Sequence, residues 1–311
     1  MAKTKFCQGV SDISDSYMGF IIDQWGTLHD GENLFPGVLD CMKELKERKK
    51  TILLLSNSTR RAEFHKDELK KMGLGPSLYS EIVTSGEVIW QGLHRQTGGV
   101  FQKIGKKCFV FSRGDDTSIL DGTGVTAVDD IENADFVLIT GMDYPRKTLE
   151  HYEPLIRRAI QLRLKAVCPS PDSLSMIGNA LLKGPSLLAR RYQDSGGIVY
   201  HIGKPHSLIF MHCIEILKEK EIYPSGTVVL GDTMAHDVIG GHAVSLDTCL
   251  FKSGLHAANF GHCQTPKEVH NALKNLIAVY NNVMPTYLAD EMRWGRALPD
   301  RKHKKRKQPK S

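Results

Sequence analysis

The chain has 311 residues, enough for one large domain or two smaller ones, and its 41% apolar and 24% charged content is ordinary for a soluble globular protein. It has no apolar run near the roughly 18 residues of a membrane span and no secretion-type start, which argues against a membrane partner. Its seven cysteines include no CxxC pair, which argues against a disulfide framework and a zinc site. The net charge of +6 comes from residues 301–311, which hold seven Lys and Arg; the remainder has 34 basic and 35 acidic residues. We expect a cytoplasmic protein, with the nucleus or an organelle matrix as alternatives.

The first part of the chain alternates strand and helix patterns. Short apolar runs at 18–23 and 51–57 predict buried strands, and helical spacing over 36–50 and 61–73 predicts two amphipathic helices. A third buried strand is predicted much later, at 227–232. This alternation is typical of an α/β fold with a mostly parallel sheet.

Between these segments lies a second α/β stretch. Residues 106–114, 134–141 and 165–172 resemble strands, and 148–162 resembles a helix. We therefore predict a core domain built from 1–84 and 196–290, an inserted smaller domain at 85–195, and a basic, disordered tail at 291–311. Apolar helical positions within 267–284 are expected to complete the core.

Polar side chains follow the three core strands at the points where they end. Asp23, then Ser56 and Asn57, then Asp232 stand in these positions. Because ligands bind beyond the carboxyl ends of parallel strands, these residues could converge on one site. Each also has a plainer interpretation as a turn or helix-capping residue.

Two further residues add charge to this set. Lys204 lies between Gly and Pro in HIGKPH, where a fixed cation could neutralise phosphate, although a surface turn is the simpler reading. Asp237 follows Asp232 by five residues, and such paired acids suit a hard cation such as Mg²⁺. The alternative is an N-capped helix with Asp237 in solvent.

The order of these motifs resembles the four motifs of the haloacid dehalogenase (HAD) superfamily. The resemblance spans about residues 18–262, and the insertion between the second and third motifs resembles class IIA members. DQWGTLHDG at 23–31 is similar to a bacterial-type class IIA subgroup that reads D-x-W-G. The resemblance implies a Rossmann-like parallel-sheet core with an inserted smaller α/β cap domain.

The resemblance also implies roles for these residues. Asp23 would attack phosphorus to form an aspartyl-phosphate, with Lys204 offsetting the crowded negative charge. Ser56 and Asn57 would hold phosphate oxygens. The Mg²⁺ ligands would be Asp23, the backbone carbonyl of Trp25, Asp232 and Asp237.

Trp25 departs from the family pattern, because the general acid/base is normally an Asp at that position. Indole cannot shuttle a proton near neutral pH. Three readings follow: His29 or Asp30 supplies the proton, the substrate has a good leaving group such as an acyl or aryl phosphate, or the protein is no longer an effective enzyme.

In the cap, CPSPD at 168–172 corresponds by resemblance to an Asn-Pro-Asp loop. Ser170 and Asp172 would then face the substrate, although a polar loop ending a strand is the plainer reading. By analogy, a sizeable cap suits a small phosphorylated metabolite.

The basic tail supports an alternative function. Residues 301–311 could be a nuclear-import signal, an RNA-contacting arm or a solubilising end, and they hold no aromatic residue for base stacking. In this alternative the fold is a weak or inactive enzyme that joins a ribonucleoprotein or other assembly.

Overall fold

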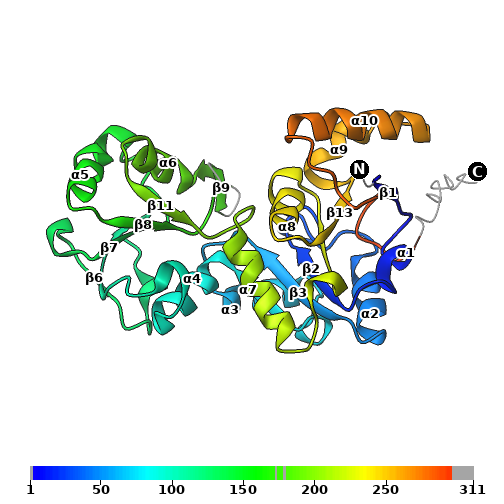
Figure 1. Ribbon diagram of the computed structural model, residues 1–311, viewed down its shortest axis with the longest axis horizontal. Helices are drawn as coiled ribbons and strands as arrows, with labels where there is room; N and C mark the ends of the chain where they lie inside the picture. Colours follow the sequence, from blue (N-terminus) through cyan, green and yellow to red (C-terminus); the bar gives the residue numbers. More distant parts are fainter. Residues whose placement is uncertain (1–2, 172–173, 178–179, 296–311) are drawn as a thin grey trace, which may run out of the picture.

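The computed structural model describes residues 3–171, 174–177 and 180–295. Two sheets organise it, and Figure 1 shows the smaller one with its helices as a lobe beside the larger one. The strands are β1 (Lys5–Phe6), β2 (Gly19–Asp23), β3 (Thr51–Ser56), β4 (Glu81–Thr84), β5 (Lys107–Phe111), β6 (Thr126–Ala127), β7 (Phe136–Ile139), β8 (Lys165–Cys168), β9 (Leu174–Ile177), β10 (Ala180–Lys183), β11 (Ile198–His201), β12 (Thr227–Gly231), β13 (Asp247–Phe251) and β14 (Tyr287–Ala289). The α-helices are α1 (Ser11–Ser14), α2 (Val38–Glu47), α3 (Ala62–Lys71), α4 (Ser85–Arg95), α5 (Leu149–Gln161), α6 (Ser186–Asp194), α7 (Ser207–Lys218), α8 (Ile239–Ala243), α9 (Ala257–Phe260) and α10 (Pro266–Val279).

The larger sheet has seven parallel strands in the order β1-β14-β13-β12-β2-β3-β4. Its central strands are mostly apolar along their length because helices cover both faces, as is usual for parallel sheets. Along β2, Phe20 and Ile22 pack with α2 and α3 on one face, whereas Ile21 packs with α4 and α7 on the other. The predicted parallel-sheet α/β fold is confirmed.

The helices form because each has one apolar face that packs on the core and one polar face in solvent. In α2, Val38, Met42 and Leu45 recur at helical spacing and are fully buried, while the lysines between them face solvent. A capping box at Thr265 and Glu268 starts α10, whose Leu273 and Leu276 are buried. The predicted role of this last helix in the core is confirmed.

The smaller sheet has five parallel strands in the order β11-β8-β7-β5-β6, with a separate antiparallel hairpin, β9–β10. Helices α5 and α6 pack on one face through Tyr152, Ile156 and Tyr192. The inserted smaller α/β domain is therefore present between the second and third motifs.

The predicted return to the core at residue 196 needs a correction. The chain first forms β11, which pairs with β8 from Ile198↔Lys165 to His201↔Cys168. The physical reason is that β11 completes the edge of the smaller sheet before the chain crosses back. The smaller sheet consequently ends only three residues before Lys204.

No helix among the described residues is both long and apolar enough to cross a membrane. The predicted tail at 301–311 lies outside the described residues.

Candidate active site

Three carboxylates meet at the carboxyl edge of the larger sheet. Asp23 is the last residue of β2, Asp232 follows the neighbouring strand β12, and Asp237 lies in the next turn. One oxygen from each lies within 4.8 Å of the others, and the residues are only 7%, 2% and 1% exposed. Of the three predicted strand ends, those of β2 and β12 therefore meet in this cluster.

Lys204 lies inside this cluster. Its Nζ donates a short hydrogen bond to Asp23 Oδ1 and another, of 2.7 Å, to Asp237 Oδ1. The lysine is 3% exposed, so the surface-turn reading is wrong. Burial alone would lower the pKa of Lys204, but the Asp23 and Asp237 carboxylates outweigh that effect and raise it.

Asp237 is fixed by its own turn. Residues Met234–Val238 form a π-helical turn, and Asp237 Oδ2 accepts hydrogen bonds from the Thr233 hydroxyl at 2.6 Å and the Thr233 N–H at 3.1 Å. This leaves Oδ1 for Lys204. The reading of Asp237 as a solvated charge is therefore wrong, because its carboxylate is buried and holds the lysine.

Asp232 is enclosed by two loops. Its Oδ2 accepts the Leu255 N–H at 2.7 Å, and its Oδ1 lies 3.4 Å from the Thr27 hydroxyl, which also lies 3.3 Å from Asp23 Oδ2. A Cβ at Gly26 would stand 2.4 Å from Asp232 Oδ2, and the backbone there has φ of +83°. Only glycine fits this close approach without strain.

The cluster is short of positive charge. If all three carboxylates were ionised, they and the lysine would carry a net charge of −2 within a buried space. Burial, with repulsion from Asp237 and Asp232, raises the pKa of Asp23 to about 8 despite Lys204; burial and Asp237 likewise raise the pKa of Asp232 to about 6. An all-carboxylate donor set with this charge fits a hard divalent cation such as Mg²⁺.

Asn57 holds the backbone of the lysine segment. Its Oδ1 accepts the Lys204 N–H at 2.7 Å, and its Nδ2 donates to the Lys204 carbonyl at 3.0 Å. The amide thus positions the backbone of Lys204. Ser56, at the end of β3, accepts the Ser58 N–H at 3.2 Å, which forms the turn toward α3.

In the loop after Asp23, the side chains of Asp30, His29 and Trp25 lie in different environments. Asp30 is exposed, and its Oδ1 accepts the Glu32 and Asn33 N–H groups, which lower its pKa. The carboxylate of Asp30 is therefore used to close a turn. His29 is buried, which lowers its pKa, and its Nδ1 accepts the Gly31 N–H at 3.1 Å. Trp25 is 53% exposed.

The cap loop approaches the site through its backbone. Gly203 N–H donates to the Pro169 carbonyl at 2.9 Å, so Pro169 lies beside the segment that carries Lys204. Ser170 is 3% exposed in this loop. Asp172 lies outside the described residues, so its predicted contact with substrate stays a prediction.

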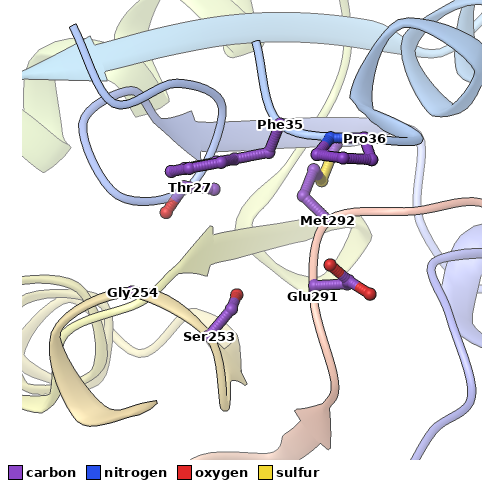
Figure 2. Close-up of a pocket in the computed structure, with 7 residues that line it drawn as sticks. All are labelled: Thr27, Phe35, Pro36, Ser253, Gly254, Glu291 and Met292. Carbon is purple, nitrogen blue, oxygen red and sulfur yellow. The ribbon is translucent and has the colours of Figure 1, made fainter. Parts of the chain in front are cut away.

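A small pocket borders the site through Thr27. Figure 2 shows it between the loop after β2, the loop after β13 and the segment that follows β14. It is lined by Thr27, Phe35, Pro36, Ser253, Gly254, Glu291 and Met292. None of the predicted phosphate- or substrate-binding residues lines this pocket.

Sequence reasoning did not single out Thr27, Thr233 or the Leu255 amide. The position of Thr27, four residues after Asp23, could have indicated this contact. The glycine between them allows a tight turn that brings the threonine hydroxyl back toward Asp23. The Leu255 contact uses a backbone N–H, which has no signature in the sequence. Ser85 was also missed; within the described part of the chain its buried Oγ has no hydrogen-bond partner.

Two family models match the chain. A haloacid dehalogenase-like hydrolase model matches residues 20–126, and a HAD-hydrolase-like model matches residues 201–276. Together they cover more than half of the 311 residues and both sides of the acidic cluster. The chain belongs to the HAD superfamily.

Relatives and solved structures agree with this assignment. The chain is 25% identical over 244 residues to a 5'-nucleotidase of Bacillus subtilis, a match that covers 77% of this chain and 89% of that protein. It is 26% identical to haloacid dehalogenase-like hydrolase domain-containing protein 2 of Mus musculus, over 76% of this chain and 85% of that one.

Among solved structures, a haloacid dehalogenase-like hydrolase of Brucella suis has a TM-score of 0.70 at 24% identity, over 92% of this chain and 99% of that one. A 4-nitrophenylphosphatase of Thermotoga maritima has a TM-score of 0.65 at 22% identity, covering 90% and 96%. These similarities show that the fold of this chain is the HAD fold.

Proposed function

We propose that this HAD protein is a Mg²⁺-dependent phosphatase of small phosphate esters that works through an aspartyl-phosphate on Asp23. The observation that carries the proposal is the buried contact of Asp23 with Lys204 inside the carboxylate cluster. The B. subtilis relative is named as a 5'-nucleotidase, which supports phosphate-ester hydrolysis as the reaction class.

In the proposed reaction, a carboxylate oxygen of Asp23 attacks phosphorus and the bond from phosphorus to the leaving-group oxygen breaks. Water then attacks the same phosphorus, releasing inorganic phosphate and restoring the carboxylate. Lys204 lowers the repulsion between the anionic nucleophile and the anionic ester, because its ammonium group contacts Asp23 directly. Ser56 and Asn57 are proposed to bind phosphate oxygens, Asn57 also keeping Lys204 in place.

The proposed metal ligands are Asp23, the Trp25 carbonyl, Asp232 and Asp237. The three carboxylates are close enough to share one ion and carry an excess of negative charge. Bound Mg²⁺ would supply positive charge beside the phosphate.

The leaving group must depart without the acid that Trp25 replaces. Asp30 is committed to its turn, and burial lowers the pKa of His29, so protonated forms of both are disfavoured near neutral pH. We therefore favour the reading in which the leaving group is good enough to need little protonation. Ser170 and Asp172 are proposed to contact the rest of the substrate.

The test is hydrolysis of p-nitrophenyl phosphate and acetyl phosphate by the full chain with Mg²⁺. We expect activity that is lost in Asp23→Asn and on addition of a chelator. Asp30→Asn is the matched control, because it makes the same change on an exposed turn of the same loop. Equal rates in the wild type and Asp23→Asn would rule out the aspartyl-phosphate mechanism.

The assembly function is the second candidate, and the replacement of the acid by an exposed Trp25 is the observation that favours it. In that case residues 301–311 would contact RNA or an assembly through charge alone. Deletion of 301–311 should abolish RNA binding, and the binding of the full chain should weaken steeply with salt. Binding that survives the deletion would exclude the tail as the contact.

A further inference from the structure

One short turn contacts both of the acidic segments that follow β12. Residues Gly254–His256 form this 3₁₀ turn after β13. Leu255 donates its N–H to Asp232 Oδ2 at 2.7 Å. The next residue, His256, accepts the Met234 N–H through Nε2 at 3.1 Å. Consecutive residues of the turn therefore contact Asp232 and the start of the π-helical turn that carries the third carboxylate.

The first residue of the turn lies directly against Asp232. A Cβ at Gly254 would stand 2.1 Å from Asp232 Oδ2, and the backbone there has φ of +73°. Only glycine adopts this conformation and this approach without strain. Because the Leu255 N–H bonds to the same oxygen, the position of Asp232 is fixed relative to the turn.

The Met234 N–H is a donor that its own turn cannot satisfy. Met234 is the first residue of the π-helical turn Met234–Val238, and the first N–H groups of a helix have no carbonyl partner within it. The Thr233 carbonyl accepts the Asp237 N–H at 3.1 Å. Met234 is fully buried, so an unpaired N–H there would destabilise the fold. His256 supplies the acceptor from a separate segment.

The same turn sets the direction of the Asp237 carboxylate. The Thr233 N–H and hydroxyl both donate to Asp237 Oδ2, and Oδ1 accepts from Lys204. Thr233 directly precedes Met234, so a shift of the Met234 backbone would move both Thr233 donors. The bond from Met234 to His256 therefore holds the support of this carboxylate in place.

His256 is itself held in a fixed position. It is 5% exposed, and the ring of Tyr280, at the end of α10, meets it edge-on with centroids 5.9 Å apart. Because the Met234 N–H can only donate, Nε2 carries no proton and the imidazole is neutral. Burial lowers the pKa of His256, although the Asn259 side chain and the charge of Asp237 act in the opposite direction.

We propose that the turn Gly254–His256 is a clamp that sets the position of the Asp232 carboxylate relative to that of Asp237, and that His256 is a positioning residue of the metal site. This inference rests on the proposed function, in which these carboxylates bind Mg²⁺. His256 contacts neither metal nor substrate and acts through the Met234 backbone. Mg²⁺ demands near-ideal octahedral geometry with oxygens at about 2.0–2.1 Å, so a small displacement of one ligand weakens its binding.

Two amide variants of the full chain test the clamp through metal binding. His256→Gln carries an amide oxygen about as far along the side chain as Nε2, whereas His256→Asn is one methylene shorter and cannot reach the Met234 N–H. By calorimetry on the metal-free protein, His256→Asn should raise the dissociation constant of Mg²⁺ about tenfold, and His256→Gln should stay within about twofold of the wild type. His212→Asn is the control, because it changes a partly buried histidine of α7. Equal dissociation constants for His256→Gln and His256→Asn would overturn the proposal.

Amide hydrogen exchange gives a readout that needs no metal and no turnover. The Met234 amide should exchange slowly in the wild type and in His256→Gln, and about tenfold faster in His256→Asn, because only the shorter side chain leaves it unbonded. Faster exchange with unchanged Mg²⁺ affinity would make the role of His256 purely structural and contradict the proposal. Equal exchange in the two variants would refute the clamp and leave the metal site standing. A wild type that binds no Mg²⁺ would instead refute the metal site of the proposed function.

Discussion

The carboxylates and the lysine of the site are at most 7% exposed, whereas Trp25, from the same loop as the nucleophile candidate, is 53% exposed. At the buried end Lys204 bonds to the Asp23 and Asp237 carboxylates, Thr233 also bonds to Asp237, and the Leu255 N–H bonds to Asp232. At the exposed end the neighbouring acid Asp30 only closes a turn. The groups proposed to bind phosphate and metal thus lie together in the buried cluster, while Trp25 occupies the position at which the resemblance implies a proton donor.

The largest expected effect lies at the buried end. Lys204→Met removes the only cation among the described residues that bonds to Asp23 and Asp237, so activity should fall by about 10³-fold or more. It should also lower the free energy of unfolding by about 3 kcal/mol, because buried carboxylates lose their partner. Urea denaturation and hydrolysis assays measure the two effects.

Lys50→Met is the control for that variant. Lys50 is also buried, but its Nζ donates to the Tyr17 carbonyl at 2.8 Å, away from the carboxylates. It should lose stability and keep activity. If Lys204→Met retained more than a tenth of the wild-type rate, the lysine would have no part in the chemistry.

The next largest effect is expected at the exposed end of the site, where an acid can be restored in place of Trp25. Trp25→Asp restores a carboxylic acid two residues after Asp23, and it should raise kcat for alkyl phosphates about 10²-fold. The gain for p-nitrophenyl phosphate should be much smaller, since its leaving group needs little protonation. Trp25→Asp combined with Asp23→Asn should be inactive, and no gain on alkyl phosphates would mean that the site has changed elsewhere as well.

The effect of Mg²⁺ on thermal stability tests the buried end of the site without any assay of turnover. Mg²⁺ at about 100 times its dissociation constant should stabilise the metal-free protein by about 2.7 kcal/mol, and raise its Tm by about 5 °C. Asp237→Asn should reduce this shift, because one of the three carboxylates is neutralised. Asp30→Asn should show the full shift, and identical shifts in both variants would place the metal elsewhere.

The smallest expected effect concerns the junction of the two sheets. Burial, with the charge of His206 stacked 4.7 Å away, lowers the pKa of His201 to about 4. The unfolded chain then binds more protons than the folded one between about pH 6.5 and 4, so stability is full above pH 6.5 and falls across that window. Because His201 keeps some exposure, we expect a loss of about 1–2 kcal/mol.

Chemical denaturation at pH 7 and pH 5 measures that loss. His201→Gln removes the titrating group while keeping a polar side chain that can face Gln193, the present partner of His201 at 3.1 Å. Its stability should depend less on pH than that of the wild type. A wild type and a variant with the same pH dependence would show that other groups dominate in this range.

Sequence alone determined much of the fold and several of the residues that meet at the candidate site. Apolar runs ending in Asp23, Ser56 and at Gly231–Asp232 predicted parallel strands, because a strand buried on both faces must be apolar along its length. Order and spacing of these motifs, with Lys204 and Asp237, predicted the family. The end of the insertion was misplaced because β11 is only four residues long and its pairing with β8 is a long-range contact.

Only the tertiary structure decided how the site residues are used. That Lys204 is buried between two carboxylates, that Asn57 bonds to its backbone, and that Asp30 closes a turn depend on contacts between distant segments or on loop conformation. The same holds for Trp25, whose exposure follows from a loop that rests its ring on Gly31. Residue type limits which chemistry a side chain can perform, but its neighbours set its charge, its hydrogen bonds and its access to a ligand.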